Sequence, residues 1–312
     1  MTGLHIVATG MALPTRCVSN DDLAKTVDTN DEWIQSRTGI RSRYYTDGET
    51  NWELASRAAE LAIQRAGIST EELGACIVAT ITSDYATPSV ACMVQKTLEL
   101  PESIPSFDIN AACSGFLYGL EVAHGLLQVQ KQDYILLIGS EQLSRVLDFE
   151  DRSTCILFGD GAAAAIIKRS SEHAFSSILG ASGNDESLYC GGTGSERQKV
   201  YMDGKAVFRF AVETIPKVLE QILQENQMTL DDIDYVVCHQ ANERIIEYVR
   251  KKMKADESQF YINIDHFGNT SAASIPLALA EMDKKGMLGT GKKIICVGFG
   301  AGFTWGGALL TF

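Results

Sequence analysis

The sequence predicts an α/β fold built from two similar halves, and three observations support this prediction. Short apolar runs bounded by turn residues alternate with longer helical patterns, as in sheets whose two faces are covered by helices. Two pairs of segments recur in the same order along the chain, which indicates a duplication. The 312 residues are 45% hydrophobic and 21% charged, a composition typical of globular proteins with a sizeable core.

Strands and helices follow from these patterns in chain order. The chain begins with residues 1–14, which we predict as a first strand because no basic residue precedes their apolar part. Further strands are predicted over residues 75–80, 133–140, 162–168, 234–240, 293–300 and 307–312. Helices are predicted over residues 51–67, 116–127 and 207–225. The polar, glycine-rich residues 183–205 predict an irregular connection that can line a pocket.

The predicted duplication depends on two pairs of segments. GISTEELGACIVAT (67–80) parallels QMTLDDIDYVVCHQ (227–240), since in each a turn and acidic residues precede a buried strand. ILFGDGAAAAII (156–167) parallels VGFGAGFTWGGALL (297–310) through a Phe-Gly-x-Gly motif before a strand. We expect the active site where the two halves meet; chance similarity between α/β segments is the alternative. The two halves would span residues 1–170 and 171–312.

Composition and charge argue against several functional classes. The net charge of −13 is atypical of nucleic-acid-binding proteins, which usually carry a basic surplus. No apolar run reaches 18 residues and no signal peptide is recognised, so we expect a cytoplasmic protein without a membrane span. The eight cysteines include no CxxC pair, so we predict no metal site. In a reducing compartment most of them should be buried thiols.

One cysteine differs from the others in its neighbours. In DINAACSGFLYGL (108–120), Cys113 lies between an apolar strand-like run and a helix that is apolar on nearly all sides. The N-terminus of a helix favours an anion by about 0.3–1 kcal/mol, which would lower the pKa of a thiol by about one unit. Small neighbours leave the sulfur open to a bound carbonyl. Cys113 is therefore either an acyl-cysteine nucleophile with a further activating partner or an ordinary buried thiol.

Three further stretches place polar groups where α/β proteins bind ligands. His239 ends the predicted strand in VVCHQANERI, at the carboxyl end of a sheet. Asn269 lies in the turn of HFGNTSAASIPLAL, where asparagine is common. GFGAGFTWGG has Phe303 where the dinucleotide pattern GxGxxG requires glycine, so we predict a tight turn near a pocket instead of a phosphate loop. Taken singly, each stretch has an ordinary structural explanation.

Together and in this order, the four stretches resemble the signature of the thiolase superfamily, and most closely that of its β-ketoacyl-acyl carrier protein synthase III family. The resemblance covers essentially the whole chain. It implies a thiolase-like five-layered αβαβα fold with two pseudo-duplicated halves, a homodimer and no cofactor, since the CoA thioester is a substrate. It also implies a catalytic triad of Cys113, His239 and Asn269.

The resemblance implies a condensing enzyme that initiates fatty-acid synthesis in two half-reactions. Cys113 would take the acyl group of an acyl-CoA. Malonyl-acyl carrier protein would then lose CO2, with its enolate held by His239 and Asn269, and attack the acyl-cysteine to give a 3-oxoacyl-acyl carrier protein. The backbone N–H groups of Cys113 and Ala301 would form an oxyanion hole, in which one donor contributes about 2.7–4 kcal/mol. Many relatives have glycine where Ala301 stands, but alanine keeps the N–H group.

Substrate contacts are implied by the same resemblance. Trp33 and Arg152 would sandwich the adenine of CoA, with Arg37 near its phosphates; a core tryptophan and surface arginines are the alternative. The remaining CoA-binding positions implied are Asn242, Met202, Gly204 and Phe208. Thr87 matches an acyl-pocket position contributed by the partner subunit, and its small side chain favours primers larger than acetyl.

An acidic carrier protein requires a local basic patch on this acidic chain. In NERIIEYVRKKMK (242–254), Arg244 and Lys251 lie seven residues apart and therefore within about 20° around a helix axis. Ile245, Ile246, Val249 and Met253 fall on the opposite side and should face the core. Arg209 matches a third basic position implied by the resemblance. We expect these three cations to dock the carrier protein, with a merely solvated basic face as the alternative.

Two other functions stay open at this point. One is a secondary-metabolism acyltransferase with the same fold, which would condense malonyl-carrier poorly or use a different nucleophile. The other is a non-catalytic acyl-CoA-binding protein. Selective alkylation of Cys113 by iodoacetamide would argue against the binding protein, because such a protein needs no reactive thiol.

Overall fold

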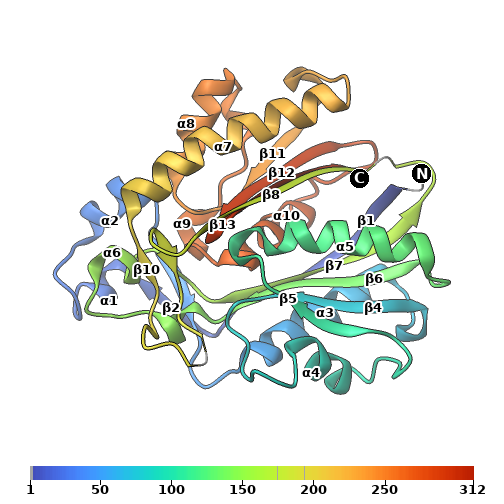
Figure 1. The fold of residues 1–312 in the computed structure, drawn as a ribbon, viewed down its shortest axis with the longest axis horizontal. Helices are drawn as coiled ribbons and strands as arrows, with labels where there is room; N and C mark the ends of the chain where they lie inside the picture. Colours follow the sequence, from blue (N-terminus) through green and yellow to red (C-terminus); the bar gives the residue numbers. More distant parts are fainter. Residues whose placement is uncertain (1–2, 174, 193) are drawn as a thin grey trace.

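Most strands of the chain lie in two sheets that run through the molecule one above the other (Figure 1). The computed structural model describes residues 3–173, 175–192 and 194–312. The N-terminal sheet contains, in spatial order, β1 (Gly3–Ala12), β7 (Gly161–Ser170), β6 (Tyr134–Glu141), β4 (Leu73–Ala79) and β5 (Ser106–Ile109). The C-terminal sheet contains β11 (Tyr235–Cys238), β12 (Lys293–Gly300), β13 (Gly302–Thr311) and β8 (Ser176–Asn184). Two small ribbons pair β2 (Arg16–Ser19) with β3 (Ser42–Tyr45) and β9 (Leu188–Tyr189) with β10 (Tyr201–Met202).

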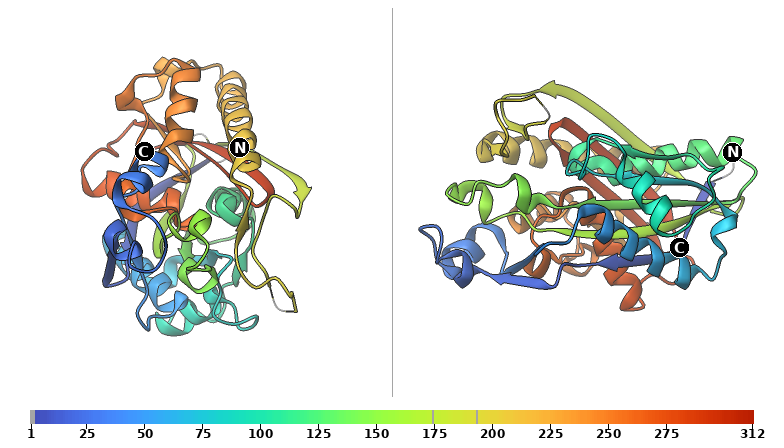
Figure 2. Two further views of the ribbon diagram at one scale, coloured as in Figure 1. Left: turned by 90° about the vertical axis from the view of Figure 1, so that its left-hand side faces the viewer. Right: turned by 90° about the horizontal axis from the view of Figure 1, so that it is seen from below.

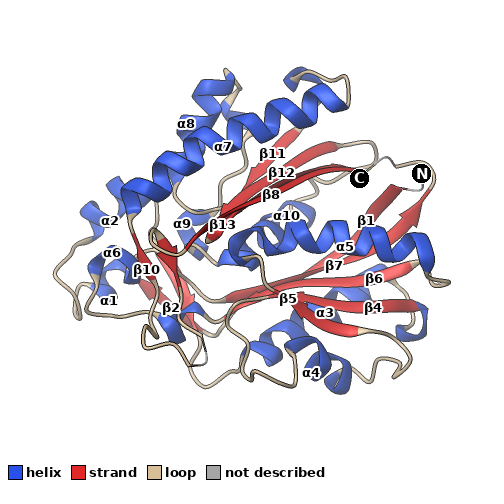
Figure 3. Cartoon of the chain, viewed as in Figure 1, coloured by secondary structure: helices blue, strands red, loops and turns tan. Residues whose placement is uncertain are grey.

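Helices alternate with the two sheets, which gives five layers (Figure 3). The outer face of the N-terminal sheet is covered by α3 (Asn51–Ala66) and α4 (Val90–Thr97), and that of the C-terminal sheet by α7 (Gly204–Glu225) and α8 (Glu243–Met253). The layer between the sheets consists of α5 (Gly115–Val129) and α10 (Ser274–Lys284). Short helices lie at one end: α1 (Asn20–Leu23), α2 (Asp31–Thr38), α6 (Arg152–Cys155) and α9 (Ile264–Phe267). The predicted αβαβα architecture is confirmed.

The two sheets share one internal pattern of strand directions. β1 and β6 both pair antiparallel to β7, and β4 pairs parallel to β6. In the same order, β8 and β12 pair antiparallel to β13, and β11 pairs parallel to β12. β5 extends the first sheet beside β4, and its counterpart is an isolated parallel bridge between Val236 and Phe260. The segments that looked alike in the sequence contain equivalent strands, whereas the division at residue 170 remains a prediction.

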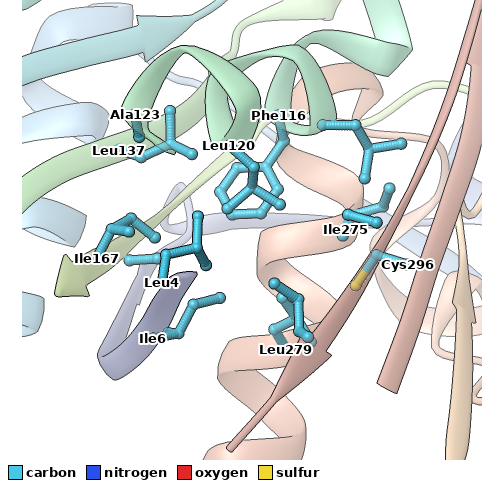
Figure 4. Close-up of a cluster of buried hydrophobic side chains, with 14 of the residues drawn as sticks. Leu4, Ile6, Phe116, Leu120, Ala123, Leu137, Ile167, Ile275, Leu279 and Cys296 are labelled. Atoms are coloured by element: carbon cyan, nitrogen blue, oxygen red, sulfur yellow. The ribbon is translucent and has the colours of Figure 1, made fainter. Parts of the chain in front are cut away.

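The central layer binds the two sheets into one core (Figure 4). Phe116 and Leu120 of α5 lie against Ile275 of α10, and all three are at most 1% exposed. Burial of each such side chain contributes about 1.5–3 kcal/mol. The sequence predicted a buried helix here because its residues are apolar on nearly all sides, but Glu121 and other positions of α5 are exposed in the single chain. The helix is therefore buried along its core-facing side only.

The connection between β8 and α7 lies at the periphery of the molecule (yellow in Figure 2). The prediction of an irregular segment is partly wrong, because β9 and β10 form a short ribbon within it. α7 begins at Gly204, three residues before the predicted start, since the Asp203 carboxylate accepts hydrogen bonds from the N–H groups of Lys205 and Ala206. No helix in the described residues is long and apolar enough to cross a membrane.

Candidate active site

A cavity of about 140 Å³ lies where residues of both halves meet. Its walls are mostly apolar, with a few polar side chains, as is common for small-molecule sites. The predicted site residues found in its lining are Cys113, His239, Asn269, Asn242, Met202, Gly204, Phe208 and Ala301. The segment that contains β9 and β10 contributes to the same lining, as predicted for residues 183–205.

Cys113 lies in the middle of a 3-10 turn, Ala112–Ser114, between β5 and α5. The first N–H groups of such a turn have no partner within it. Ala112 adopts a φ of 48°, and its N–H group donates to Asn110 Oδ1 at 3.3 Å. Gly300 packs so closely here that a β-carbon on it would lie 2.6 Å from the Cys113 backbone nitrogen. Only glycine permits this approach, which brings the backbone before Ala301 next to the turn that holds Cys113.

The surroundings of the Cys113 thiol favour its protonated form. Burial is the main cause that raises its pKa to about 12, and the charge of Glu141 adds to this increase. The nearby Ser271 hydroxyl opposes the increase, although that hydroxyl has no hydrogen bond of ordinary geometry in the described structure. The net pKa of the thiol is therefore raised and not lowered, because desolvation outweighs the decrease of about one unit expected from the helix N-terminus alone.

His239 follows the last residue of β11, and its backbone N–H donates to Val297 O at 2.7 Å. The side chain is 2% exposed and packs edge-on against Phe299, with ring centroids 5.7 Å apart. Burial lowers the pKa of the imidazole to about 3, so the ring is neutral at physiological pH. Its Nδ1 has no hydrogen-bond partner among the described residues. An unpaired ring nitrogen in a buried site is costly, which suits a group that bonds to a substrate.

Asn269 lies in a turn that fixes the orientation of its amide. Oδ1 accepts the Ser271 N–H at 2.9 Å, so the Nδ2 group is the part left to donate. The backbone of Asn269 also pairs with the first half, through Leu157 O at 2.8 Å and Gly159 N at 3.0 Å. The donor is therefore held by both halves of the fold.

The turns at Cys113 and Asn269 are two copies of one structure. In each, an asparagine Oδ1 accepts the N–H of the residue two positions later, and that residue adopts a positive φ of 48° or 49°. A 3-10 turn and a central helix follow in both cases, α5 after Cys113 and α10 after Asn269. By this alignment, Asn110 corresponds to Asn269 and Cys113 to Ala272.

The residues expected to bind CoA lie at one end of the molecule. The Arg152 guanidinium stacks directly on Trp33, 4.6 Å from the ring centroid, and also donates to Asp28 O at 2.8 Å. A base between these two groups needs about 7–8 Å, so sandwiching adenine requires them to separate. Asn242 Nδ2 donates to the backbone oxygen of Arg37 at 3.1 Å, which connects α8 to α2.

The three predicted docking cations are all exposed. Arg244 and Lys251 lie on α8, and Arg209 lies on α7, the helix packed against it. None of the three forms an ion pair with a described residue. The opposite side of α8 faces the core as predicted, with three residues buried and Met253 partly so: Ile245, Ile246 and Val249.

Comparison with known proteins decides the family. Residues 107–183 match the family description "3-Oxoacyl-[acyl-carrier-protein (ACP)] synthase III", and residues 223–312 match its C-terminal part. A β-ketoacyl-[acyl-carrier-protein] synthase III from Clostridium tetani (strain Massachusetts / E88) is 46% identical over 98% of each chain. The chain belongs to the 3-oxoacyl-[acyl-carrier-protein] synthase III family.

Solved structures agree with this assignment to the synthase III family. A 3-oxoacyl-[acyl-carrier-protein] synthase III from Aquifex aeolicus VF5 superposes with a TM-score of 0.95 at 40% identity, covering 99% of this chain and all of that one. The priming β-ketosynthase of the R1128 polyketide pathway matches with a TM-score of 0.93 at 30% identity, covering 99% and 96%. The predictions of a thiolase-like fold and of an acyltransferase that initiates fatty-acid synthesis are confirmed. The secondary-metabolism alternative is less well supported, because its representative is more distant.

Several residues of this synthase III site were missed in the sequence. Ser271 lines the cavity and Glu141 is fully buried, and neither was predicted, whereas Tyr189 and Cys190 line it within the predicted segment 183–205 without having been singled out. Glu141 directly follows the strand predicted over residues 133–140, and a carboxylate at the end of an apolar strand is the signal that could have identified it. Thr87 is exposed and does not line the cavity of its own chain.

Proposed function

We propose that Cys113 accepts the acyl group of an acyl-CoA primer and then donates it to malonyl-acyl carrier protein, which gives a 3-oxoacyl-acyl carrier protein, CoA and CO2. The observation that carries the proposal is the convergence of Cys113, His239 and Asn269 on one cavity, against the backbone of Gly300 and Ala301. The role of each residue follows from the protonation states of Cys113 and His239 and from the hydrogen bond of Asn269.

In the first half-reaction, the sulfur of Cys113 forms a bond to the thioester carbon and the C–S bond to CoA breaks. Because the thiol is protonated at rest, its proton must leave as the sulfur attacks. His239 is neutral and can accept the proton and return it to the departing CoA sulfur. The N–H groups of Cys113 and Ala301 bind the oxyanion of the tetrahedral intermediate.

In the second half-reaction, malonyl-acyl carrier protein loses CO2 and its enolate carbon attacks the acyl-cysteine. The C–S bond to Cys113 breaks as the new C–C bond forms. His239 and Asn269 donate hydrogen bonds to the enolate oxygen, and Asn269 does so without changing its protonation. The fixed Asn269 amide supports this role, because its oxygen is already engaged by the Ser271 N–H.

The binding partners belong to the same proposal. CoA is held by Trp33, Arg37, Arg152 and Asn242, and the carrier protein docks on Arg209, Arg244 and Lys251. The protein acts in the cytoplasm as a homodimer, with Thr87 completing the partner's acyl pocket and admitting primers larger than acetyl. Support for the dimer comes from β5, which ends the N-terminal sheet and leaves one edge of that sheet unpaired among the residues that the structure describes.

Incubation with acetyl-, isobutyryl- and hexanoyl-CoA, followed by peptide mass spectrometry, tests the proposal. We expect one acyl group on Cys113 in the wild type and in Cys190→Ser, a control at the same cavity, and none in Cys113→Ser. Absence of acylation at Cys113, or acylation of Cys190 instead, would contradict the proposed nucleophile. If only acetyl-CoA acylated Cys113, the proposal that the pocket admits larger primers would be wrong, while the proposed nucleophile would stand.

A further inference from the structure

Thr304 is a half-buried residue whose hydroxyl lies between the two segments of the proposed oxyanion hole. One segment is the 3-10 turn that carries the N–H group of Cys113, and the other is the hairpin between β12 and β13, which carries that of Ala301. Thr304 forms the last pair of this hairpin, with Gly300. It is not among the described residues that line the cavity, so its effect on the reaction must pass through its neighbours.

Three hydrogen-bond distances connect the Thr304 hydroxyl to both segments. Oγ1 lies 2.9 Å from Ala111 O and 3.2 Å from Ser114 Oγ, at the two ends of the Cys113 turn. It also lies 3.1 Å from Ala301 O in the hairpin. A hydroxyl has one proton and two lone pairs, so Thr304 donates to one carbonyl at a time while it accepts from the Ser114 hydroxyl. The side chain therefore bridges the two segments.

The backbone packing between these segments leaves a role for such a bridge. A β-carbon on Gly300 would lie 2.6 Å from the Cys113 nitrogen, so contact between the two backbones limits how closely they approach. Contact does not fix how the peptide groups point, whereas a hydrogen bond is directional. Ala111, the N-cap of the turn, has no side-chain hydrogen bond to it, so its carbonyl is held by the Ser114 N–H at 3.1 Å and by Thr304.

We propose that Thr304 is a positioning residue for the oxyanion hole: its hydroxyl holds the Cys113 turn and the Ala301 hairpin so that both N–H groups point to one oxyanion. This inference rests on the proposed function, in which the thioester oxygen becomes an oxyanion when Cys113 attacks. Such donors stabilise the transition state because they are placed before the reaction. Loss of the bridge should therefore weaken the hole without removing either donor.

The ratio of two reactions of Cys113 tests the proposal, and peptide mass spectrometry measures both. Acylation by acyl-CoA passes through an oxyanion, whereas iodoacetamide alkylates the sulfur by displacing iodide from a saturated carbon and forms none. Thr304→Val keeps the shape of the side chain but lacks the hydroxyl. It should acylate about tenfold more slowly than the wild type, which is less than the loss of a whole donor. Its alkylation rate should stay within about twofold of the wild type.

A conservative variant and a matched control accompany this measurement. Thr304→Ser keeps the hydroxyl and should acylate within about threefold of the wild-type rate. Thr304→Ala is a second variant without the hydroxyl and should show the same lowered ratio. Thr9→Val is the control, because the Thr9 hydroxyl also joins distant elements, donating from β1 to Asp283 Oδ2 of α10 at 2.8 Å, but it does not line this cavity. It should leave both rates unchanged.

Several results would overturn the role of Thr304. One is acylation at the wild-type rate in Thr304→Val and Thr304→Ala. Another is equal slowing of acylation and alkylation, which would mean that the sulfur itself is displaced. A third is acylation in Thr304→Ser as slow as in Thr304→Val. Failure of acyl-CoA to acylate Cys113 in the wild type contradicts the proposed function instead, so the two failures are distinguishable.

Discussion

In the proposed active site His239 acts through a neutral ring, because burial lowers the pKa of its imidazole to about 3. We therefore expect His239→Ala to decarboxylate malonyl-carrier about 10²–10³-fold more slowly, the usual cost of losing one oxyanion donor. Acylation of Cys113 should persist at a reduced rate, because the N–H groups of the oxyanion hole remain. Release of CO2 and mass spectrometry of the acyl-cysteine measure the two steps separately.

Asn269→Ala is the companion variant, and it should lose decarboxylation while keeping acylation near the wild-type rate. If His239→Ala slowed both steps equally, the proposed division between nucleophile and donors would be wrong.

Gly300 is a second single residue with a measurable role. In Gly300→Ala, the new β-carbon would collide with the backbone of the Cys113 turn at 2.6 Å, and backbone cannot move as a flexible side chain can. We expect the free energy of unfolding to fall by about 1–3 kcal/mol and acylation to slow by at least about tenfold as the turn shifts. Chemical denaturation and acyl-CoA labelling measure these two effects.

Gly289→Ala is the control, since a β-carbon there meets no atom within 4 Å. It should leave both stability and acylation unchanged. If Gly300→Ala and Gly289→Ala had the same free energy of unfolding and the same acylation rate, the close approach of Gly300 to Cys113 would contribute to neither.

At the scale of elements, helices α7 and α8 together present the proposed docking surface. Arg244→Glu reverses a charge on the exposed side of α8 and should raise the KM for malonyl-acyl carrier protein about tenfold, with little effect on acylation by acyl-CoA. The effect should shrink at high salt, because exposed charges are screened. Steady-state kinetics at two ionic strengths would measure it.

Lys217→Glu provides the matched control on α7, eight residues and therefore about 12 Å along the helix from Arg209. It carries the same charge change at an exposed position. An equal increase in KM for both variants would mean that net charge, and not a local site, attracts the carrier protein.

The ends of elements were harder to predict than their existence. The run from residue 133 predicted β6 well, but its end missed Glu141, because a carboxylate rarely continues a buried strand. Similarly, α7 begins earlier than its apolar pattern, at a cap that only Asp203 supplies. The apolar periodicity of a single helix or strand does not show which polar residues extend it, because their role depends on contacts with other parts of the fold.

For the whole molecule, burial of neutral His239 predicts a pH dependence of stability. The folded-state pKa is about 3, compared with 6.5 for the ordinary imidazole, so the unfolded state binds a proton more readily. Stability should therefore be lost as the pH falls from 6.5 towards 3, by about 5 kcal/mol at the lower limit. Denaturation of the wild type and His239→Gln should show a difference that grows in this range. A difference in stability between the two proteins that did not change with pH would contradict this prediction.

The overall architecture could be predicted because the two halves repeat the same sequence patterns. Each half carries the same alternation of elements, and the Phe-Gly-x-Gly motif precedes the equivalent strands β7 and β13. The electrostatic state of Cys113 was not predictable, because desolvation depends on what the fold places around the sulfur. The sequence alone contained the helix end at Cys113 but not the burial that outweighs it.

The two asparagine turns show how a repeated fold can present two different side chains to one cavity. The same backbone turn, present twice, holds the proposed nucleophile Cys113 in one copy and the proposed donor Asn269 in the other. The two copies share a backbone shape but carry different side chains: position 113 has a thiol, whereas its counterpart Ala272 is small and packs against Gly139 of β6. The two turns face one cavity, where they place the proposed nucleophile and one proposed donor together, and the loop after β11 adds His239.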